Sequence, residues 1–281
     1  MKKPVVIAVV AILLVAAIVA GVLIYNSSKE KAIAKIKIGA TPSPHQEVLE
    51  LIADDLKASG FEIEIITFTE YPLPNPALAN KELDANYFQH MPYLNAYNST
   101  VNTKDRLLAA IPVHYEPYGI YAGKTKSLDA LADGATITIT NDPSNETRAL
   151  LLLRDAGLIT LPEDASPESS LVVYDILENP KNLKIVEVEA STLPATLEDA
   201  DLAVINGNFA IGAGLSPAKD ALFLEPTDGE SAKVYANYVV IRSEDETKDF
   251  VAALKTALQS EKVRNFMLTN ETYAGGVIPM F

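Results

Sequence analysis

Strand-like and helix-like stretches alternate along the chain, and the first complete β–α–β unit spans residues 36–68. The run IKIGA (36–40) has the composition of a strand, and in EVLELIADDLKAS (47–59) Val48, Leu51 and Leu56 can share one face of a helix. Gly60 is a natural helix stop, and FEIEIITF (61–68) begins the next strand. This pattern predicts an α/β protein with mainly parallel sheets.

The remaining strand and helix candidates are too numerous for one sheet. Strands are predicted at 84–88, 107–113, 118–123, 135–140, 183–190, 201–207, 221–225 and 235–242, and helices at 146–157 and 249–269. Because a sheet usually holds about five or six strands, we expect two α/β lobes with a cleft between them.

The N-terminus carries Lys2 and Lys3 ahead of an uncharged apolar run from Val5 to Tyr25. About twenty such residues cross a bilayer as a helix, whereas a cleaved signal has a shorter apolar core and a small-x-small site. Ile18 occupies the first small position of a cut after Ala20. We therefore predict an uncleaved single-pass transmembrane anchor at 1–25 and a linker at 26–35, with the remainder on the extracytoplasmic side of the cell membrane.

The composition and motifs of the chain argue against several classes of function. The chain contains no cysteine, which excludes disulfides, thiolate metal sites and cysteine nucleophiles. A net charge of −14 without a basic run argues against nucleic acid as a partner. No GxSxG, HExxH or P-loop motif occurs, so we predict a protein that is not an enzyme and needs no cofactor.

The histidines raise the question of a metal site. His45, His90 and His114 are the three in the chain and could converge as imidazole ligands. They form no HxH or HxxxH pair and no acidic cluster flanks them, so a metal site is not predicted.

Polar residues follow two predicted strands, where open α/β sheets usually bind ligands. After strand 135–140 the sequence NDPSNETR offers Asp142 as a helix cap, and the N–H groups of that helix end suit a carboxylate. Arg148 in its first turns binds a ligand carboxylate or forms a surface ion pair with an acidic neighbour. Asn206, at the end of strand 201–207, is a ligand amide or an ordinary turn residue.

The stretch NYFQHMPYLNAY (86–97) concentrates aromatic residues. Alternation along a strand would place Asn86, Phe88 and His90 on one face and Tyr87 and Gln89 on the other. Such a face fits either the edge of the core or the aromatic wall of a small-molecule pocket.

Several ordered stretches resemble the NlpA lipoprotein family, the methionine-binding proteins of ABC importers. They include TPSPHQEVLE (41–50), TFTEYPLPNPAL (67–78), LDANYFQHMPYL (83–94), NDPSNETRALLLL (141–153), ENPKNLKIVEVEASTLP (178–194), LAVINGNFA (202–210) and SPAKDALFLE (216–225). The resemblance covers nearly everything after residue 35 and implies a periplasmic-binding-protein-like fold that closes on an amino acid. It implies crossovers near 116–123 and 235–240, lobe 1 from 36–118 plus 236–281, and lobe 2 from 119–235.

The resemblance also implies a ligand site. Its aromatic residues would be Tyr71, Phe88 and Tyr93 with His90 alongside, its carboxylate-binding residue Arg148, and its amide ligands Asn206 and Asn237. Tyr87 is left as packing. One departure stands out: family members carry a lipid-modified cysteine after a small-residue pair, whereas here Val22 follows Ala20 and Gly21.

We therefore expect a solute-binding protein that captures methionine and delivers it to an ABC transporter permease, with membrane attachment through the N-terminal helix. A binder of another small amino acid or short peptide stays open as an alternative, as does a metal-binding or sensory module.

Overall fold

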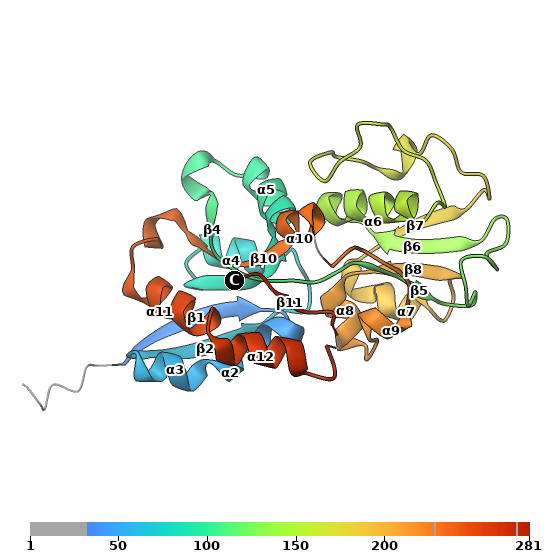
Figure 1. Ribbon diagram of the computed structural model, residues 1–281. Helices are drawn as coiled ribbons and strands as arrows, with labels where there is room; N and C mark the ends of the chain where they lie inside the picture. The colour runs from blue at the N-terminus through green and yellow to red at the C-terminus, as the bar shows by residue number, and fades with distance from the viewer. Residues whose placement is uncertain (1–32, 228, 274) are drawn as a thin grey trace, which may run out of the picture.

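Two β-sheets with helices packed against them make up the protein in a computed structural model, which describes residues 33–227, 229–273 and 275–281 (Figure 1). The strands are β1 (Ala34–Ala40), β2 (Phe61–Thr67), β3 (Ala85–His90), β4 (Leu107–Tyr115), β5 (Gly119–Ala122), β6 (Thr136–Thr140), β7 (Lys184–Val188), β8 (Leu202–Ile205), β9 (Ala221–Leu224), β10 (Ala236–Arg242) and β11 (Ile278–Pro279). The main helices are α2 (Glu47–Leu51), α3 (Ala53–Ala58), α4 (Pro74–Ala79), α5 (Met91–Thr100), α6 (Pro143–Asp155), α7 (Leu193–Thr196), α8 (Gly207–Gly212), α9 (Pro217–Asp220), α10 (Glu230–Val234), α11 (Asp249–Leu258) and α12 (Glu261–Thr269).

The first lobe is built on a six-stranded sheet with the order β11-β4-β10-β3-β1-β2. Strand β1 runs parallel to β2 and β3, as the first β–α–β unit predicts. Strand β10 returns late in the chain and inserts antiparallel between β3 and β4. One apolar cluster joins α2, α3, α11 and α12 to this sheet, and a second cluster contains residues of α4, α5, β4 and β10.

The second lobe is built on a five-stranded sheet with the order β7-β6-β8-β5-β9. Strand β6 is parallel to β7 and β8, whereas β5 is antiparallel to β8 and β9. Its own apolar cluster gathers the leucines of α6 against β6 and β8. The prediction of two sheets is confirmed, and the prediction of mainly parallel sheets is wrong because β5 and β10 enter from the opposite lobe and run against their neighbours.

Several predicted helices and strands have different bounds in the structure. The predicted helix 47–59 is broken at Ile52, where ψ is 0°. The predicted helix 249–269 is two helices, since Ser260 caps α12 by accepting a hydrogen bond from the Val263 N–H at 3.4 Å. Strand β1 begins at Ala34, so the end of the predicted linker 26–35 belongs to the first sheet.

The chain passes between the lobes twice, from β4 to β5 and from β9 to β10. The two crossings are joined by a backbone hydrogen bond of 2.9 Å from the Glu225 N–H to the Tyr118 carbonyl. Within the described ranges no helix combines the length and apolar character that a membrane span requires. The predicted anchor at 1–25 lies outside the described residues.

Candidate functional site

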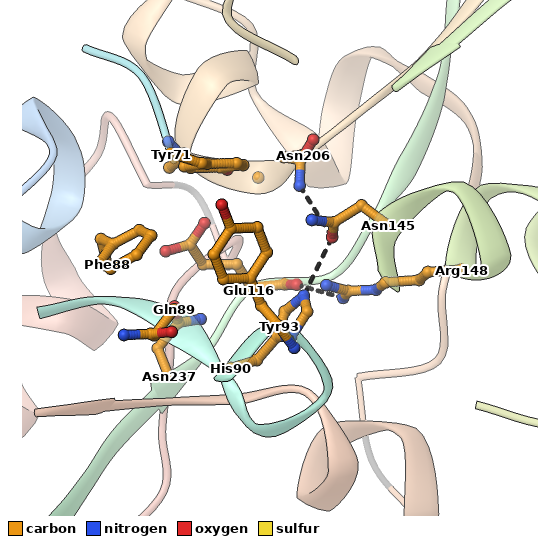
Figure 2. A pocket seen from close by; sticks show the side chains of 12 residues that line it. Tyr71, Phe88, Gln89, His90, Tyr93, Glu116, Asn145, Arg148, Asn206 and Asn237 are labelled. Carbon is orange, nitrogen blue, oxygen red and sulfur yellow. Dashed lines mark hydrogen bonds between the residues drawn. The ribbon is translucent and has the colours of Figure 1, made fainter. Parts of the chain in front are cut away.

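A cavity between the two lobes gathers side chains from both of them. It is lined by Tyr71, Phe88, Gln89, His90, Tyr93, Glu116, Asn145, Arg148, Asn206, Gly207, Asn208 and Asn237. All seven residues that the sequence singled out therefore face one cavity (Figure 2).

An aromatic wall forms one side of the cavity. Tyr71 lies with its ring centroid 5.9 Å from Phe88 and 5.7 Å from Tyr93, and Phe88 and Tyr93 are 5.6 Å apart. Phe209 of α8 reaches this wall from the second lobe, 5.0 Å from Tyr71. Tilted and edge-on rings at these separations attract one another and present a surface suited to an apolar side chain.

The end of β3 delivers Phe88, Gln89 and His90 to the cavity, but the predicted alternation is partly wrong. Strand β10 pairs Tyr238 with Gln89 and Val239 with Tyr87, so that Phe88 is skipped in a β-bulge. A bulge shifts the facing of the residues that follow. Gln89 therefore contacts Asn86, with its Nε2 donating to the Asn86 Oδ1 at 2.9 Å, instead of lying on the opposite face.

Buried amides fix the segment that carries Tyr71. The Asn75 Nδ2 donates to the Gln89 Oε1 at 2.9 Å, and the Gln89 Nε2 donates back to the Asn75 Oδ1 at 2.6 Å. Asn86 adds a 2.9 Å bond to the same Asn75 oxygen. These bonds tie α4 to β3, so the aromatic wall rests on a fully hydrogen-bonded support.

A chain of side chains crosses the cavity from His90 to Asn206. The His90 Nε2 donates to the Asn145 Oδ1 at 3.0 Å, while its Nδ1 accepts from the Tyr93 N–H at 3.2 Å. The Asn206 Nδ2 donates to the same Asn145 oxygen at 3.2 Å. Burial, reinforced by the charge of Arg148, lowers the pKa of His90 to about 3, so the imidazole is neutral at pH 7.

The N-terminus of α6 is capped from within the chain. Asp142 accepts hydrogen bonds from the Asn145 N–H at 3.1 Å and from the Asn145 Nδ2 at 2.9 Å. The cap and Pro143 at the first turn confirm the predicted helix start. The carboxylate of Asp142 already accepts a hydrogen bond from an N–H of this helix end, and the binding of a ligand carboxylate there stays a prediction.

Arg148 is buried, and it pairs with Glu225. Its Nε donates to the Glu225 Oε1 at 2.8 Å and its Nη2 to the Oε2 at 2.5 Å, and Nη2 also reaches the Glu116 carbonyl at 2.8 Å. The guanidinium carbon lies 4.0 Å from the ring centroid of Tyr235 and 4.8 Å from that of Tyr118. The predicted ion pair with an acidic neighbour thus exists in the interior, not on the surface.

Glu225 is held as a carboxylate by its neighbours. Its Oε2 also accepts from the Tyr115 hydroxyl at 2.8 Å and from the Tyr118 N–H at 2.9 Å. Burial alone would raise the pKa of Glu225, but Arg148 and these donors together hold it below its ordinary value. Within the described part of the chain no acceptor contacts the Nη1 group of Arg148, so two N–H donors stay available at the cavity.

Glu116 brings a second buried carboxylate to the cavity, from the first crossing between the lobes. Its Oε1 accepts from the His114 Nε2 at 2.6 Å, and the Asn208 N–H at the start of α8 is a further partner. A Cβ on Gly207 would lie 2.7 Å from the Glu116 Cβ, so only glycine allows this approach. Burial raises the pKa of Glu116, opposed by His45 and Arg148.

Two of the histidines meet behind the cavity, with Glu116 between them. The ligand atoms of His45, His114 and Glu116 all lie within 4.8 Å of one another. Their outer nitrogens contact hydroxyls, His45 the Thr41 Oγ1 at 2.8 Å and His114 the Tyr87 hydroxyl. Burial lowers the pKa of His45 to about 4 and that of His114 to about 3, so both imidazoles are uncharged at pH 7. Their outer ring nitrogens are satisfied by the hydrogen bonds just described.

The three histidines considered as possible metal ligands do not all converge. His90 faces the cavity and is separate from the pair of His45 and His114. Asn237 joins the two regions, since its Oδ1 lies 3.2 Å from the His45 Nε2 while the residue lines the cavity. Tyr87 lies in the core of the first lobe, as predicted.

Glu116, Asn145, Asn208 and Glu225 are the polar residues that the sequence reasoning missed. Asn145 lies inside NDPSNETR, Glu116 lies between predicted strands 107–113 and 118–123, and Glu225 is the last residue of predicted strand 221–225. That position, next to a strand end at a crossover, is the signal that could have identified them.

Comparison with known proteins identifies the family of this chain. A sequence model of the NlpA lipoprotein family matches residues 36–281. The D-methionine-binding lipoprotein MetQ of Escherichia coli strain K12 is 41% identical over 255 residues, with 89% of each chain covered. The structure of a nutrient binding protein from Burkholderia cenocepacia bound to methionine has a TM-score of 0.81 and 39% identity, covering 88% of this chain and 100% of that one.

A third relative is an ABC transporter periplasmic substrate-binding protein from Coxiella burnetii. Its structure has a TM-score of 0.79 and 39% identity, and the match covers 87% of this chain and 99% of that one.

Proposed function

Because this chain belongs to the NlpA lipoprotein family, we propose that it is an extracytoplasmic solute-binding protein that captures methionine and delivers it to the permease of an ABC importer. One observation carries the proposal: a single cavity between the lobes offers an aromatic wall beside a buried arginine and a buried carboxylate. The function is binding and release, without chemical change to the ligand.

The cavity has a complementary group for each part of methionine. The α-carboxylate would accept hydrogen bonds from the Nη1 of Arg148, and the α-ammonium would lie at the carboxylate of Glu116. The thioether would lie against Phe88 and Tyr93, since sulfur contacts aromatic rings favourably. Asn206 and Asn237 line the same space and offer amide groups to the polar end.

Closure of the lobes would bury the ligand. Hydrogen bonds already join the lobes across the cavity, from the Tyr71 hydroxyl to the Asn208 Oδ1 at 2.5 Å and from His90 to Asn145 at 3.0 Å. A ligand that contacts both lobes stabilises this closed arrangement relative to an open one. The permease would then recognise the closed form.

We also propose the lobe boundaries 36–118 plus 236–281 and 119–235, which the membership of the strands in the two sheets supports. For membrane attachment we propose the apolar segment 5–25, because the chain has no cysteine to which a lipid could be linked. The mass of the N-terminal peptide from membrane-extracted protein tests this: a chain that begins after residue 20 would contradict it.

The binding proposal is tested by titrating methionine into the full chain in detergent, after unfolding and refolding to remove carried-over ligand. We expect saturable binding that Arg148→Met weakens by more than tenfold, since a hydrogen bond to a charged group contributes about 1.5–3 kcal/mol. Arg154→Met on the same helix is the matched control, because its side chain is 35% exposed and pairs with Asp155. Absence of amino-acid binding in the refolded wild type would refute the proposal.

The alternative within the same fold is another small amino acid or a short peptide, and native mass spectrometry of the protein as purified separates these by the mass of the bound molecule. Metal binding has one observation in its favour, the group of His45, His114 and Glu116. Zinc titration of the full chain tests it, and a lack of uptake would dispose of that function.

A further inference from the structure

Arg148 and Glu116 bring opposite charges to the lining of the cavity, and His90 contributes an uncharged imidazole. Asp142 adds a negative charge close enough to disfavour the ionisation of Tyr71 and Tyr93.

The positive charge of Arg148 is already neutralised before a ligand enters. Glu225 contacts it through two hydrogen bonds of 2.8 and 2.5 Å, and the exposed fractions of the two side chains are 4% and 8%. In such a buried environment a paired charge attracts a further anion much less strongly than an unpaired one. Arg148 is therefore a directional hydrogen-bond donor to a carboxylate more than a free charge.

Glu116, in contrast, forms no ion pair with a lysine or arginine among the described residues, although the charge of Arg148 acts on it. Its neighbours His114 and His45 lie 2.6 and 3.4 Å away and are neutral at pH 7, and its remaining partner is a backbone N–H. The carboxylate is 6% exposed, so solvent screens it poorly. Burial raises the pKa of Glu116, and an α-ammonium group beside it would favour the charged carboxylate.

We propose that Glu225 determines the charge class of the ligand: by neutralising Arg148 it makes the cavity select zwitterions and amines against acids that lack an ammonium group. This inference rests on the proposed function and names the residue that restricts its ligands. Glu225 does not line the cavity, and it acts on the ligand through Arg148.

Two analogues of methionine separate the two charges without adding bulk. One is the acid that lacks the α-amino group, and the other is the amine that lacks the carboxylate. Calorimetry at pH 8 with the full chain in detergent gives Kd for each and for methionine. We expect wild type to bind the amine at least tenfold more tightly than the acid, and Glu225→Gln to shift the ratio of the two Kd values at least tenfold towards the acid.

Glu163→Gln is the control, because it removes the same charge from an exposed position in the second lobe. Wild-type protein that binds methionine but prefers the acid overturns the inference while leaving the proposed function intact, and so does an unchanged ratio in a folded Glu225→Gln. If Glu225→Gln does not fold, the wild-type preference alone decides. Failure of all three ligands to bind wild type would instead overturn the proposed function.

Discussion

Replacing Arg148 by methionine should destabilise the protein and abolish tight ligand binding, and the two effects can be separated. The substitution removes the cation from Glu225 but leaves a buried carboxylate with the Tyr115 hydroxyl and the Tyr118 N–H as its donors. The Glu116 carbonyl loses its 2.8 Å partner as well.

The expected size follows from the burial of the pair. Removing one partner of a buried ion pair costs about 3–5 kcal/mol, because the other charge stays behind without compensation. Adding Glu225→Gln to Arg148→Met removes that charge while keeping an oxygen for the two tyrosine donors. We expect the double variant to recover about 2 kcal/mol or more of the loss.

The pH dependence of the free energy of unfolding gives a second test of this assignment. Without Arg148, burial should raise the folded-state pKa of Glu225 above its unfolded value. A raised carboxyl pKa contributes stability below the unfolded pKa and loses it as pH rises. The free energy of unfolding of Arg148→Met should therefore fall relative to that of the double variant between pH 5 and pH 8.

Urea unfolding followed by circular dichroism measures these differences, and calorimetry measures methionine binding in the same samples. Both variants should lose binding, although the double variant is the more stable of the two. A double variant no more stable than Arg148→Met, with a gap that does not depend on pH, would refute the assignment of the loss to an uncompensated Glu225.

Three further predictions concern the cavity and its surroundings. Tyr71→Phe removes the hydroxyl that donates to Asn208 at 2.5 Å across the lobes, and it should weaken methionine binding about three- to tenfold in calorimetry; equal affinity would mean that the closed, liganded form does not use this bond. Gly207→Ala places a Cβ 2.7 Å from that of Glu116 and should lower both the melting temperature and the affinity, whereas Gly212→Ala on the same helix meets nothing within 4 Å and should not; matching melting curves would contradict the close approach. Since burial lowers the pKa of the three histidines to between about 3 and 4, their stability contribution is present above pH 6.5 and is lost as pH falls, so urea unfolding should show a decrease of about 2 kcal/mol per histidine between pH 7 and pH 5; a flat profile would count against it.

Much of the fold was predictable because apolar patterning determines most strands and helices locally. The direction of β5 and β10 was not, since it depends on which lobe each strand enters. The bulge at Phe88 has the same origin: it arises from pairing between β3 and β10, which lie about 150 residues apart in sequence. A strand pattern read alone could only predict regular alternation.

The site likewise contains residues that the sequence could predict and residues that it could not. Aromatic residues and an arginine at a helix start are uncommon enough in this chain to attract notice, and they do face one cavity. Glu116 and Glu225 are two of 37 acidic residues, most of which read as a solvated surface. Their burial follows from tertiary contacts with Arg148 and the histidines, which no local pattern reveals.

The position of β10 has a consequence for biosynthesis. All of the second sheet is encoded between residues 119 and 224, so its strands can pair as soon as that stretch has been synthesised. The first sheet is different, because β10 (Ala236–Arg242) lies between β3 and β4. Until β10 has been synthesised, β4 cannot be joined to β1, β2 and β3 in one sheet. Although it begins at the N-terminal end of the described chain, the first lobe can therefore complete its sheet only after all strands of the second sheet have been synthesised.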